Sequence, residues 1–353
     1  MRAPYRLLDL FAGCGGLTQG FVSTERYRSV GAVELDADAA ATYDENFECD
    51  VFNGDIATWL AGSRLAEADL VLGGPPCQGF STLGHRRPDD PRNSLWRHYV
   101  EAIERVAPRV FVLENVPGFA KSDEFAMLVE QTNSRGPLRD YSVIHHVVDA
   151  SHYGTPQRRK RVIVIGWQSE LGPLDFPPPT TALHPPTVRD ALQGIGWEVA
   201  DVDLPHPHGP YSSRELHLTR NLRDLSRQRI AAIPPGGNRF ALPDELQAPC
   251  WRKHTKGSAD VMGRLHWDQP SVTIRTEFYK PEKGRYLHPV ADRPITHFEA
   301  SLLQGFPKNY KWMGSKTSIG RQIGNAVPIP LGAVLATHIA TWLDSVLGAR
   351  TST

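Results

Sequence analysis

The chain has 353 residues, of which 40% are hydrophobic and 22% charged, with a formal net charge of +0. This composition is typical of a globular protein with enough apolar residues for one large domain and a smaller one. A disulfide framework, a zinc site and a membrane span are not expected, because Cys14, Cys49, Cys77 and Cys250 lie far apart and no run of eighteen apolar residues occurs.

The first 167 residues alternate between short apolar runs and amphipathic stretches. The runs are rich in Val, Leu, Ile and Phe, as in strands that are buried on both faces of a sheet. Between two of them, residues 94–106 carry apolar side chains at helical spacing. This alternation predicts a doubly wound α/β domain. The expected strands are 5–10, 29–35, 68–73, 109–116, 141–150 and 161–167.

The residue composition and the hydrophobic periodicity of the sequence change near Pro173. Residues 173–250 are rich in Pro, Gly, His and Arg, and hydrophobic periodicity fades there, which predicts a loop-rich second domain after the hinge Pro177–Pro179. Residues 331–347 are amphipathic again and predict a final helix that packs on the first domain.

Charge is segregated along the chain although the net charge is zero. Residues 1–60 hold four Lys/Arg and ten Asp/Glu, whereas residues 205–260 hold nine Lys/Arg and five Asp/Glu. Such segregation suits a protein with one surface that faces an anion, although basic runs are more often simply solvated.

A glycine-rich segment, Asp9–Gly16, follows the first expected strand. Glycines after a strand let the backbone pass close to a ligand at the start of a helix. Glu34 ends the second strand, where a carboxylate can accept hydrogen bonds from a ribose, and Asp55 would end the third. This set suits a dinucleotide or an adenosyl cofactor, with a plain tight turn as the alternative.

A second motif, Gly73–Ser81, ends another expected strand. Pro75 and Pro76 fix the backbone before the thiol of Cys77. A cysteine at the carboxyl end of a strand, where ligands bind in α/β sheets, is a candidate nucleophile rather than a buried structural cysteine. Glu114 directly follows the next strand and is expected to face the same crevice.

With these motifs the chain resembles the DNA (cytosine-5)-methyltransferase family of bacterial restriction–modification systems, over nearly its whole length. Six segments match the family's motifs in the family's order. They are the cofactor loop 9–16, the nucleophile motif 75–78, the acidic motif 114–116, the basic motif 157–161, the motif 293–307 that closes the recognition region, and the last motif 322–328.

The resemblance implies a reaction. The thiolate of Cys77 would add to C6 of a cytosine flipped out of double-stranded DNA, and C5 would then accept the methyl group of S-adenosyl-L-methionine. Glu114, kept neutral by a dry pocket that raises its pKa, would hydrogen-bond N3 of the base. Arg159 and Arg161 would hold the base carbonyl and the neighbouring acids.

The resemblance also implies the cofactor site and the domain order. A Rossmann-like, S-adenosylmethionine-dependent catalytic domain would comprise residues 1–172 together with the returning segment 295–353, and residues 173–294 would form a smaller inserted target-recognition domain. The residues implied at the cofactor are Phe11, Gly13, Gly15, Glu34, Asp55, Ile56, Pro76, Asn325 and Val327.

DNA contacts are expected from three segments. The loop after Cys77 is similar to the mobile loop of the family, and residues 251–264 and 273–285 look like recognition loops. Arg or Lys there could read guanine edges, with phosphate contacts as the alternative. The candidate DNA-binding residues are Ser81, Arg86, Arg87, Arg252, Lys253, Thr273 and Arg275.

Three other functions were weighed. A tRNA cytosine-5 methyltransferase shares the catalytic motifs, but the long basic insert favours DNA. A catalytically silent DNA-binding regulator would not need Cys77 and Glu114, and a nicotinamide dehydrogenase has no use for Pro75–Gln78. We therefore expect a cytoplasmic, nucleoid-associated bacterial enzyme that is monomeric, needs no metal or membrane, and works beside a cognate restriction endonuclease.

Overall fold

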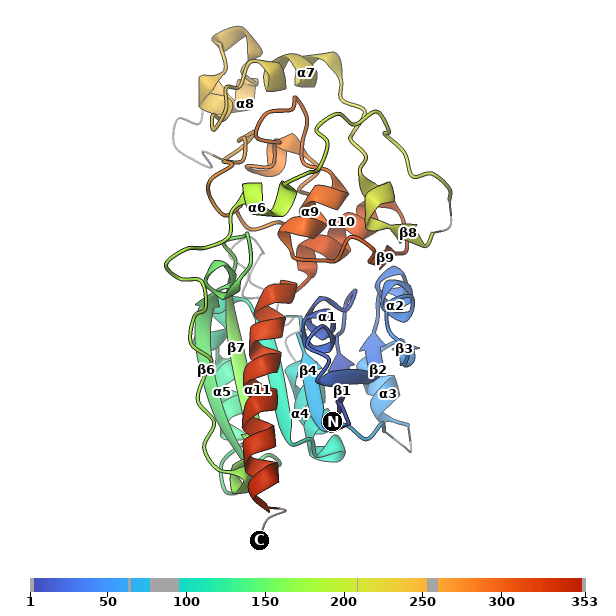
Figure 1. The fold of residues 1–353 in the computed structure, drawn as a ribbon, viewed down its shortest axis with the longest axis vertical. Coiled ribbons are helices and arrows are strands. Elements are labelled where there is room, and N and C mark those ends of the chain that lie inside the picture. Colours follow the sequence, from blue (N-terminus) through green and yellow to red (C-terminus); the bar gives the residue numbers. More distant parts are fainter. Residues whose placement is uncertain (1–2, 63–64, 77–94, 208, 253–259, 351–353) are drawn as a thin grey trace. The chain divides into compact units, whose positions relative to one another are not determined.

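The computed structural model describes residues 3–62, 65–76, 95–207, 209–252 and 260–350 (Figure 1). The chain forms two compact units. The first unit comprises residues 1–153, 160–180 and 327–353, and the second comprises 154–159 and 181–326. The second unit therefore runs further than the expected insertion of 173–294, since it keeps residues 295–326 and also takes the short segment 154–159.

A seven-stranded sheet in the order β3-β2-β1-β4-β5-β7-β6 forms the centre of the first unit. The strands β3, β2, β1, β4 and β5 are parallel neighbours, and β7 runs antiparallel to both β5 and β6. The expected α/β, Rossmann-like fold is confirmed. The strands are β1 (Tyr5–Leu10), β2 (Tyr27–Glu34), β3 (Asp50–Asn53), β4 (Leu70–Gly73), β5 (Val110–Asn115), β6 (Tyr141–Asp149) and β7 (Lys160–Gln168).

Helices cover both faces of this sheet because each strand buries alternate side chains on opposite sides. Val110, Val112 and Ile163 belong to one core cluster with side chains of α1 and α11, whereas Phe111 and Val164 belong to another with side chains of α3, α4 and α5. Figure 1 shows these helices around the sheet. The helices of this unit are α1 (Gly16–Val22), α2 (Ala37–Asp44), α3 (Ile56–Leu60), α4 (Leu95–Val106), α5 (Asp123–Glu130) and α11 (Ile329–Arg350), with 3₁₀ turns at Pro117–Lys121, Ala150–Tyr153 and Ser169–Leu171.

The final helix, α11, is long and apolar enough to cross a membrane by length and composition alone. Its side chains Leu331, Leu335, Ile339 and Leu343 are fully buried in the core of the first unit. Burial of each such side chain is worth roughly 1.5–3 kcal/mol, so this helix contributes substantially to the stability of the sheet domain. The predicted packing of the last helix on the first domain is confirmed.

The second unit has little regular structure, as the fading periodicity predicted. One of its apolar clusters contains Ile230, Ile233, Leu242, Met262 and Leu287. Other buried side chains, such as Phe298, Phe306 and Trp312, lie in a different part of the unit's sequence. Its elements are α6 (Val188–Leu192), β8 (Tyr211–Ser212), α7 (Asp224–Ala231), α8 (Pro249–Arg252), α9 (His297–Leu303), β9 (Lys311–Trp312) and α10 (Lys316–Asn325), with 3₁₀ turns at Ser213–Leu216, Arg239–Ala241, Asp244–Leu246 and Pro281–Lys283.

Buried charge stabilises the start of α9. Thr296 and Glu299 form a capping box, and the Glu299 carboxylate also accepts two hydrogen bonds from the Arg293 guanidinium, at 2.7 and 2.8 Å. Paired and charge-assisted hydrogen bonds of this kind compensate for the burial of both ions. Arg293, Thr296 and Glu299, which belong to the motif 293–307, therefore stabilise the start of α9.

The close approach of α1 and α11 predicts a steric limit at Gly20. A Cβ at this position would lie 2.6 Å from the carbonyl oxygen of Ile329 and 2.8 Å from the Cα of Gly332, and backbone atoms cannot rotate away. We expect Gly20→Ala to lower the free energy of unfolding by about 1–3 kcal/mol. The matched control is Gly348→Ala in α11, where a Cβ meets nothing within 4 Å. Urea unfolding of both variants checks this, and an unchanged midpoint for Gly20→Ala would contradict it.

Candidate active site

The carboxyl ends of β1, β4 and β5 lie at the same edge of the sheet because the three strands pair in register. Leu10 pairs with Gly73, and Gly73 pairs with Leu113. The strand order reverses at β1 and β4, which is where open α/β sheets bind their ligands. The segments that follow these strands, from Phe11, Gly74 and Glu114 onward, therefore form the candidate site.

The glycine-rich loop after β1 has an unusual backbone. Phe11, Gly13 and Gly15 have φ angles of 58°, 56° and 81°. Gly13 donates its N–H to Oε2 of Glu34 at 2.8 Å, and Asp36 donates its N–H to Oε1 of the same carboxylate, also at 2.8 Å. A Cβ at Gly13 would meet nothing within 4 Å, so the loop backbone borders open space in the first unit.

Glu34 is thus held in place by two backbone donors beside that open space. Burial raises the pKa of Glu34 above its usual value, and the hydrogen bonds from Asp36 and Gly13 oppose this effect. A carboxylate with fixed orientation and further lone pairs is suited to accept hydrogen bonds from ligand hydroxyls.

Leu35 is a residue of this region that the sequence analysis did not single out. Sequence analysis assigned Leu35 to the end of a strand, but β2 ends at Glu34 and the Leu35 side chain is 69% exposed. Gly54 donates its N–H to the Glu34 carbonyl at 3.0 Å, so the start of α3 lies next to it. There Asp55 is exposed and caps α3 through the Ala57 N–H, at 2.8 Å, while Ile56 is buried. The signal available in the sequence was a leucine directly after the carboxylate that ends a strand.

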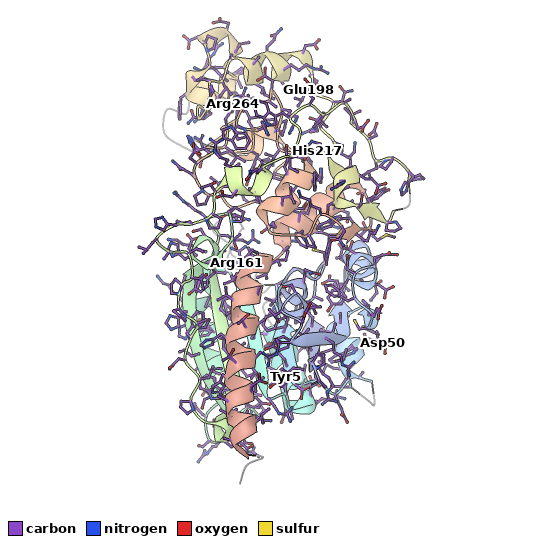
Figure 2. The ribbon with its side chains drawn as sticks, in the orientation of Figure 1. Tyr5, Asp50, Arg161, Glu198, His217 and Arg264 are labelled. Carbon is purple, nitrogen blue, oxygen red and sulfur yellow. The ribbon has the colours of Figure 1, made fainter. Side chains whose placement is uncertain are left out.

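Glu114 forms an ion pair with Arg161 across β5 and β7. Figure 2 labels Arg161 on the sheet of the first unit. Its Nε lies 2.6 Å from the Glu114 Oε1, and the two side chains are 15% and 11% exposed. A guanidinium at this distance fixes the orientation of the Glu114 carboxyl group. The action of Glu114 on a bound base stays a prediction.

The segment that precedes Cys77 is held against the same strand. Asn115 donates a side-chain hydrogen bond to the Pro75 carbonyl at 2.9 Å. A Cβ at Gly74 would lie 3.5 Å from the Glu114 Oε2, in ordinary van der Waals contact, so the carboxyl group lies beside the Gly74 backbone. The half-buried Pro76 completes the described part of the motif. Cys77, Ser81, Arg86 and Arg87 lie outside the described residues.

Arg159 has a different environment from Arg161, two residues away. Its guanidinium is buried in the second unit, where Nη1 donates to the Ile274 carbonyl at 3.0 Å and Nη2 to the Gly324 carbonyl at 2.9 Å. Gln157 makes a parallel set of contacts, since it accepts from the Ile274 N–H and donates to Gln304, both at 2.9 Å. These contacts give Arg159 and Gln157 a structural role inside the second unit.

The last motif is divided between the two units. Asn325 is exposed at the end of α10 in the second unit, and Val327 is half-buried in the first. Their approach to a cofactor stays a prediction.

The described DNA-binding candidates all belong to the second unit. The Thr273 hydroxyl donates to the Arg158 carbonyl at 2.8 Å. Arg275 is exposed, but its Nε donates to the Tyr286 hydroxyl and its Nη2 to the Lys283 carbonyl, at 2.9 and 2.8 Å. Arg252 is also exposed and donates to the Asp244 carbonyl at 2.6 Å. Lys253 lies outside the described residues.

Comparison with known proteins gives consistent matches. Residues 5–341 match the family described as C-5 cytosine-specific DNA methylase. The Type II methylase M.HgiDII of Herpetosiphon aurantiacus is 30% identical over 96% of this chain and 96% of its own length. The Type II methyltransferase M.PspPI of Psychrobacter sp. is 32% identical over 97% of this chain and 80% of its own. A solved structure of a prophage-encoded DNA modification methyltransferase from E. coli has a TM-score of 0.74 at 24% identity, covering 96% of this chain and 99% of its own.

The contacts of Arg159 predict that it is needed for stability. Lysine has one ammonium group, which cannot reach both the Ile274 and the Gly324 carbonyls, and a buried carbonyl without a donor costs about 1–3 kcal/mol. We therefore expect Arg159→Lys to lower the free energy of unfolding by about 2–4 kcal/mol. The exposed neighbour Arg158, changed to Lys, is the control and should unfold like the wild type. Full stability of Arg159→Lys together with lost activity would instead assign Arg159 to the reacting groups.

Proposed function

This chain belongs to the C-5 cytosine-specific DNA methylase family, and we propose that it moves a methyl group from S-adenosyl-L-methionine to C5 of a flipped-out cytosine, with Cys77 as nucleophile. It is a DNA (cytosine-5)-methyltransferase of the restriction–modification type. The observation that carries the finer proposal is the Glu114–Arg161 ion pair beside the Gly74–Pro76 segment, which immediately precedes the thiol.

The first unit has groups that fit the proposed methyl donor. Glu34 is oriented for the ribose hydroxyls, the exposed Leu35 offers an apolar face for the adenine ring, and Asp55 is accessible for the adenine amino group. The open backbone at Gly13 leaves room for the remainder of the molecule. When bound, S-adenosylmethionine supplies an electrophilic methyl group on a sulfonium.

The proposed role of Cys77 follows from the weak nucleophilicity of cytosine C5. Addition of the thiolate forms a bond from sulfur to C6 and moves the electron pair of the C5–C6 double bond into the ring, so that C5 can accept the methyl group. Loss of the C5 proton to a base then restores the double bond and expels the Cys77 thiolate. A stacked cytosine cannot reach such a site, so the base must leave the duplex at a cost of roughly a few kcal/mol.

Glu114 and Arg161 would act on the ring during this addition. Thiolate addition places negative charge on the ring, and a proton shared between Glu114 and N3 stabilises it. Arg161 fixes the orientation of the carboxylate through the 2.6 Å ion pair, and this orientation is set before the base arrives.

The second unit would recognise the DNA sequence. The exposed guanidiniums of Arg252 and Arg275 support this, because arginine can form paired hydrogen bonds with the edge of guanine. A cognate restriction endonuclease as functional partner, a cytoplasmic, nucleoid-associated location and a monomeric state complete the proposal.

Trapping of the covalent adduct tests the nucleophile. Duplex DNA with 5-fluorocytosine at the target should give a cofactor-dependent adduct that resists denaturation, because fluorine cannot leave as a proton. Cys77→Ser should form no adduct and transfer no methyl group while it still binds DNA, since an alkoxide is much harder to generate than a thiolate. Methylation by the serine variant would remove Cys77 from the mechanism.

Glu114→Gln is the informative companion variant. The amide keeps the shape of the side chain but cannot transfer a proton, so we expect the rate of methyl transfer to fall about 10²–10⁴-fold with donor affinity retained.

The substrate class is tested with the wild-type enzyme and S-adenosylmethionine that carries a tritiated methyl group. The label should appear in duplex DNA, and a comparable count in tRNA would support the alternative substrate.

Arg275→Ala tests base reading by the second unit. If Arg275 reads a guanine, its loss should cost roughly 1–3 kcal/mol and relax the preference at one base position. If it contacts phosphate, methylation should weaken equally on all sequences and the salt dependence should become shallower. Methylation rates on single-base variants of the site, at two salt concentrations, distinguish these results.

A further inference from the structure

A chain of buried hydrogen bonds connects β1, α1, α2 and β2 in the first unit, next to the glycine-rich loop. Asp9, near the end of β1, accepts a hydrogen bond on Oδ2 from the Thr18 hydroxyl of α1 at 2.6 Å. The Thr18 oxygen accepts from the Tyr43 hydroxyl of α2 at 3.1 Å. The Tyr43 oxygen in turn lies 2.9 Å from the hydroxyl of Ser29 in β2. All four residues are buried.

The direction of these hydrogen bonds follows from counting protons. Each hydroxyl has a single proton to donate. Thr18 gives its proton to Asp9 and Tyr43 gives its proton to Thr18. The Ser29 hydroxyl, beside the Tyr43 oxygen, donates to the Cys49 Sγ at 3.2 Å. The bonds from Tyr43 through Thr18 thus point toward the Asp9 carboxylate, an arrangement in which successive hydrogen bonds strengthen one another.

Tyr43 also packs directly against the loop. A Cβ at Gly15 would lie 3.0 Å from Cδ2 of Tyr43 and 2.4 Å from Cε2 of Phe47, and the two rings are 4.5 Å apart at their centroids. Gly15 adopts a left-handed conformation as the residue that precedes α1. Tyr43 thus supports the loop with its ring, while its hydroxyl fixes the helix that follows.

The loop needs such support because its backbone is strained. Phe11 has a positive φ, which costs a residue with a Cβ roughly 1–2 kcal/mol and persists only where the surroundings impose it. The Gly13–Glu34 hydrogen bond fixes the side of the loop that faces open space. The Asp9–Thr18–Tyr43 chain joins β1 and α1, which flank the loop, to α2.

We propose that the Tyr43 hydroxyl is a positioning group for the methyl donor, which holds the Phe11–Gly15 loop in its binding conformation through Thr18 and Asp9. This proposal rests on the proposed function, because it deepens the assignment of this loop to the donor. Tyr43 is fully buried and acts through its neighbours, so it does not touch the reacting atoms. Its loss should weaken donor binding and leave the chemical step unchanged once the donor is bound.

Tyr43→Phe tests this, because it removes the hydroxyl and keeps the ring against Gly15. We expect its dissociation constant for S-adenosylmethionine, measured by calorimetry without DNA, and its KM for the donor to rise roughly 5–30-fold. Its kcat at saturating donor should equal that of the wild type. Thr18→Val should show the same effect, and Thr18→Ser, which retains a hydroxyl, should bind the donor normally.

Tyr27→Phe is the matched control. Tyr27 is also a buried tyrosine of the first unit, and it is the first residue of β2. Its hydroxyl donates to the Ala336 carbonyl at 3.0 Å. The free energy of unfolding of Tyr27→Phe should fall, whereas its affinity for the donor should equal that of the wild type.

Two results would overturn the positioning role. In the first, Tyr43→Phe has a dissociation constant indistinguishable from that of Tyr27→Phe. In the second, its kcat falls while donor affinity stays normal. Failure of the proposed function has a different signature, since the wild type would then not bind S-adenosylmethionine at all.

Discussion

The pairing register of β4, β5 and β7 is the constraint on which the candidate site depends. Gly73 pairs with Leu113, and on the other side of β5 Glu114 pairs with Ile163. Because β7 runs antiparallel to β5 and its side chains alternate, Arg161 points to the same face as Glu114 and reaches it at 2.6 Å. A shift of one residue in either ladder would turn Glu114 or Arg161 to the opposite face and separate the ion pair.

The sheet domain could be predicted well from the sequence because the burial of a strand depends on a run of neighbouring apolar residues. Strands that are buried on both faces of a sheet require continuous apolar runs. The runs at 5–10, 109–116 and 161–167 correspond to β1, β5 and β7, with ends that differ by one residue at most. The different environments of the Arg159 and Arg161 side chains could not be predicted in this way. Both lie in one basic run, but β7 begins at Lys160, so only Arg161 belongs to the strand. The contacts of Arg159 with Ile274 and Gly324 join segments more than a hundred residues apart.

Arginine in the second unit shows why charge counting from sequence is a poor guide to DNA contact. Arg264 is buried and donates to the carbonyls of Ile230 and Ile233 at the end of α7, at 2.9 and 2.7 Å. Arg285 donates to the Gly236 carbonyl at 2.9 Å, and Arg229 to that of Leu246 at 2.7 Å. In a unit with little regular structure, guanidiniums that donate to main-chain carbonyls replace part of the missing secondary structure. The charge available to an anion is therefore smaller than the sequence of this region indicates.

The short segment 154–159 has a consequence for any exchange of the second unit between relatives. Gln157 and Arg159 hydrogen-bond to Ile274, Gln304 and Gly324, and all of these residues belong to the second unit. A chimera that replaced only residues 181–326 would leave the host's Gln157 and Arg159 facing a foreign backbone. A transplant with both stretches, joined to the host at Tyr153, Lys160, Thr180 and Val327, would carry its own internal hydrogen bonds with it. The modular unit of such an exchange is thus discontinuous in sequence, and its smaller part, 154–159, overlaps the basic motif 157–161 of the host.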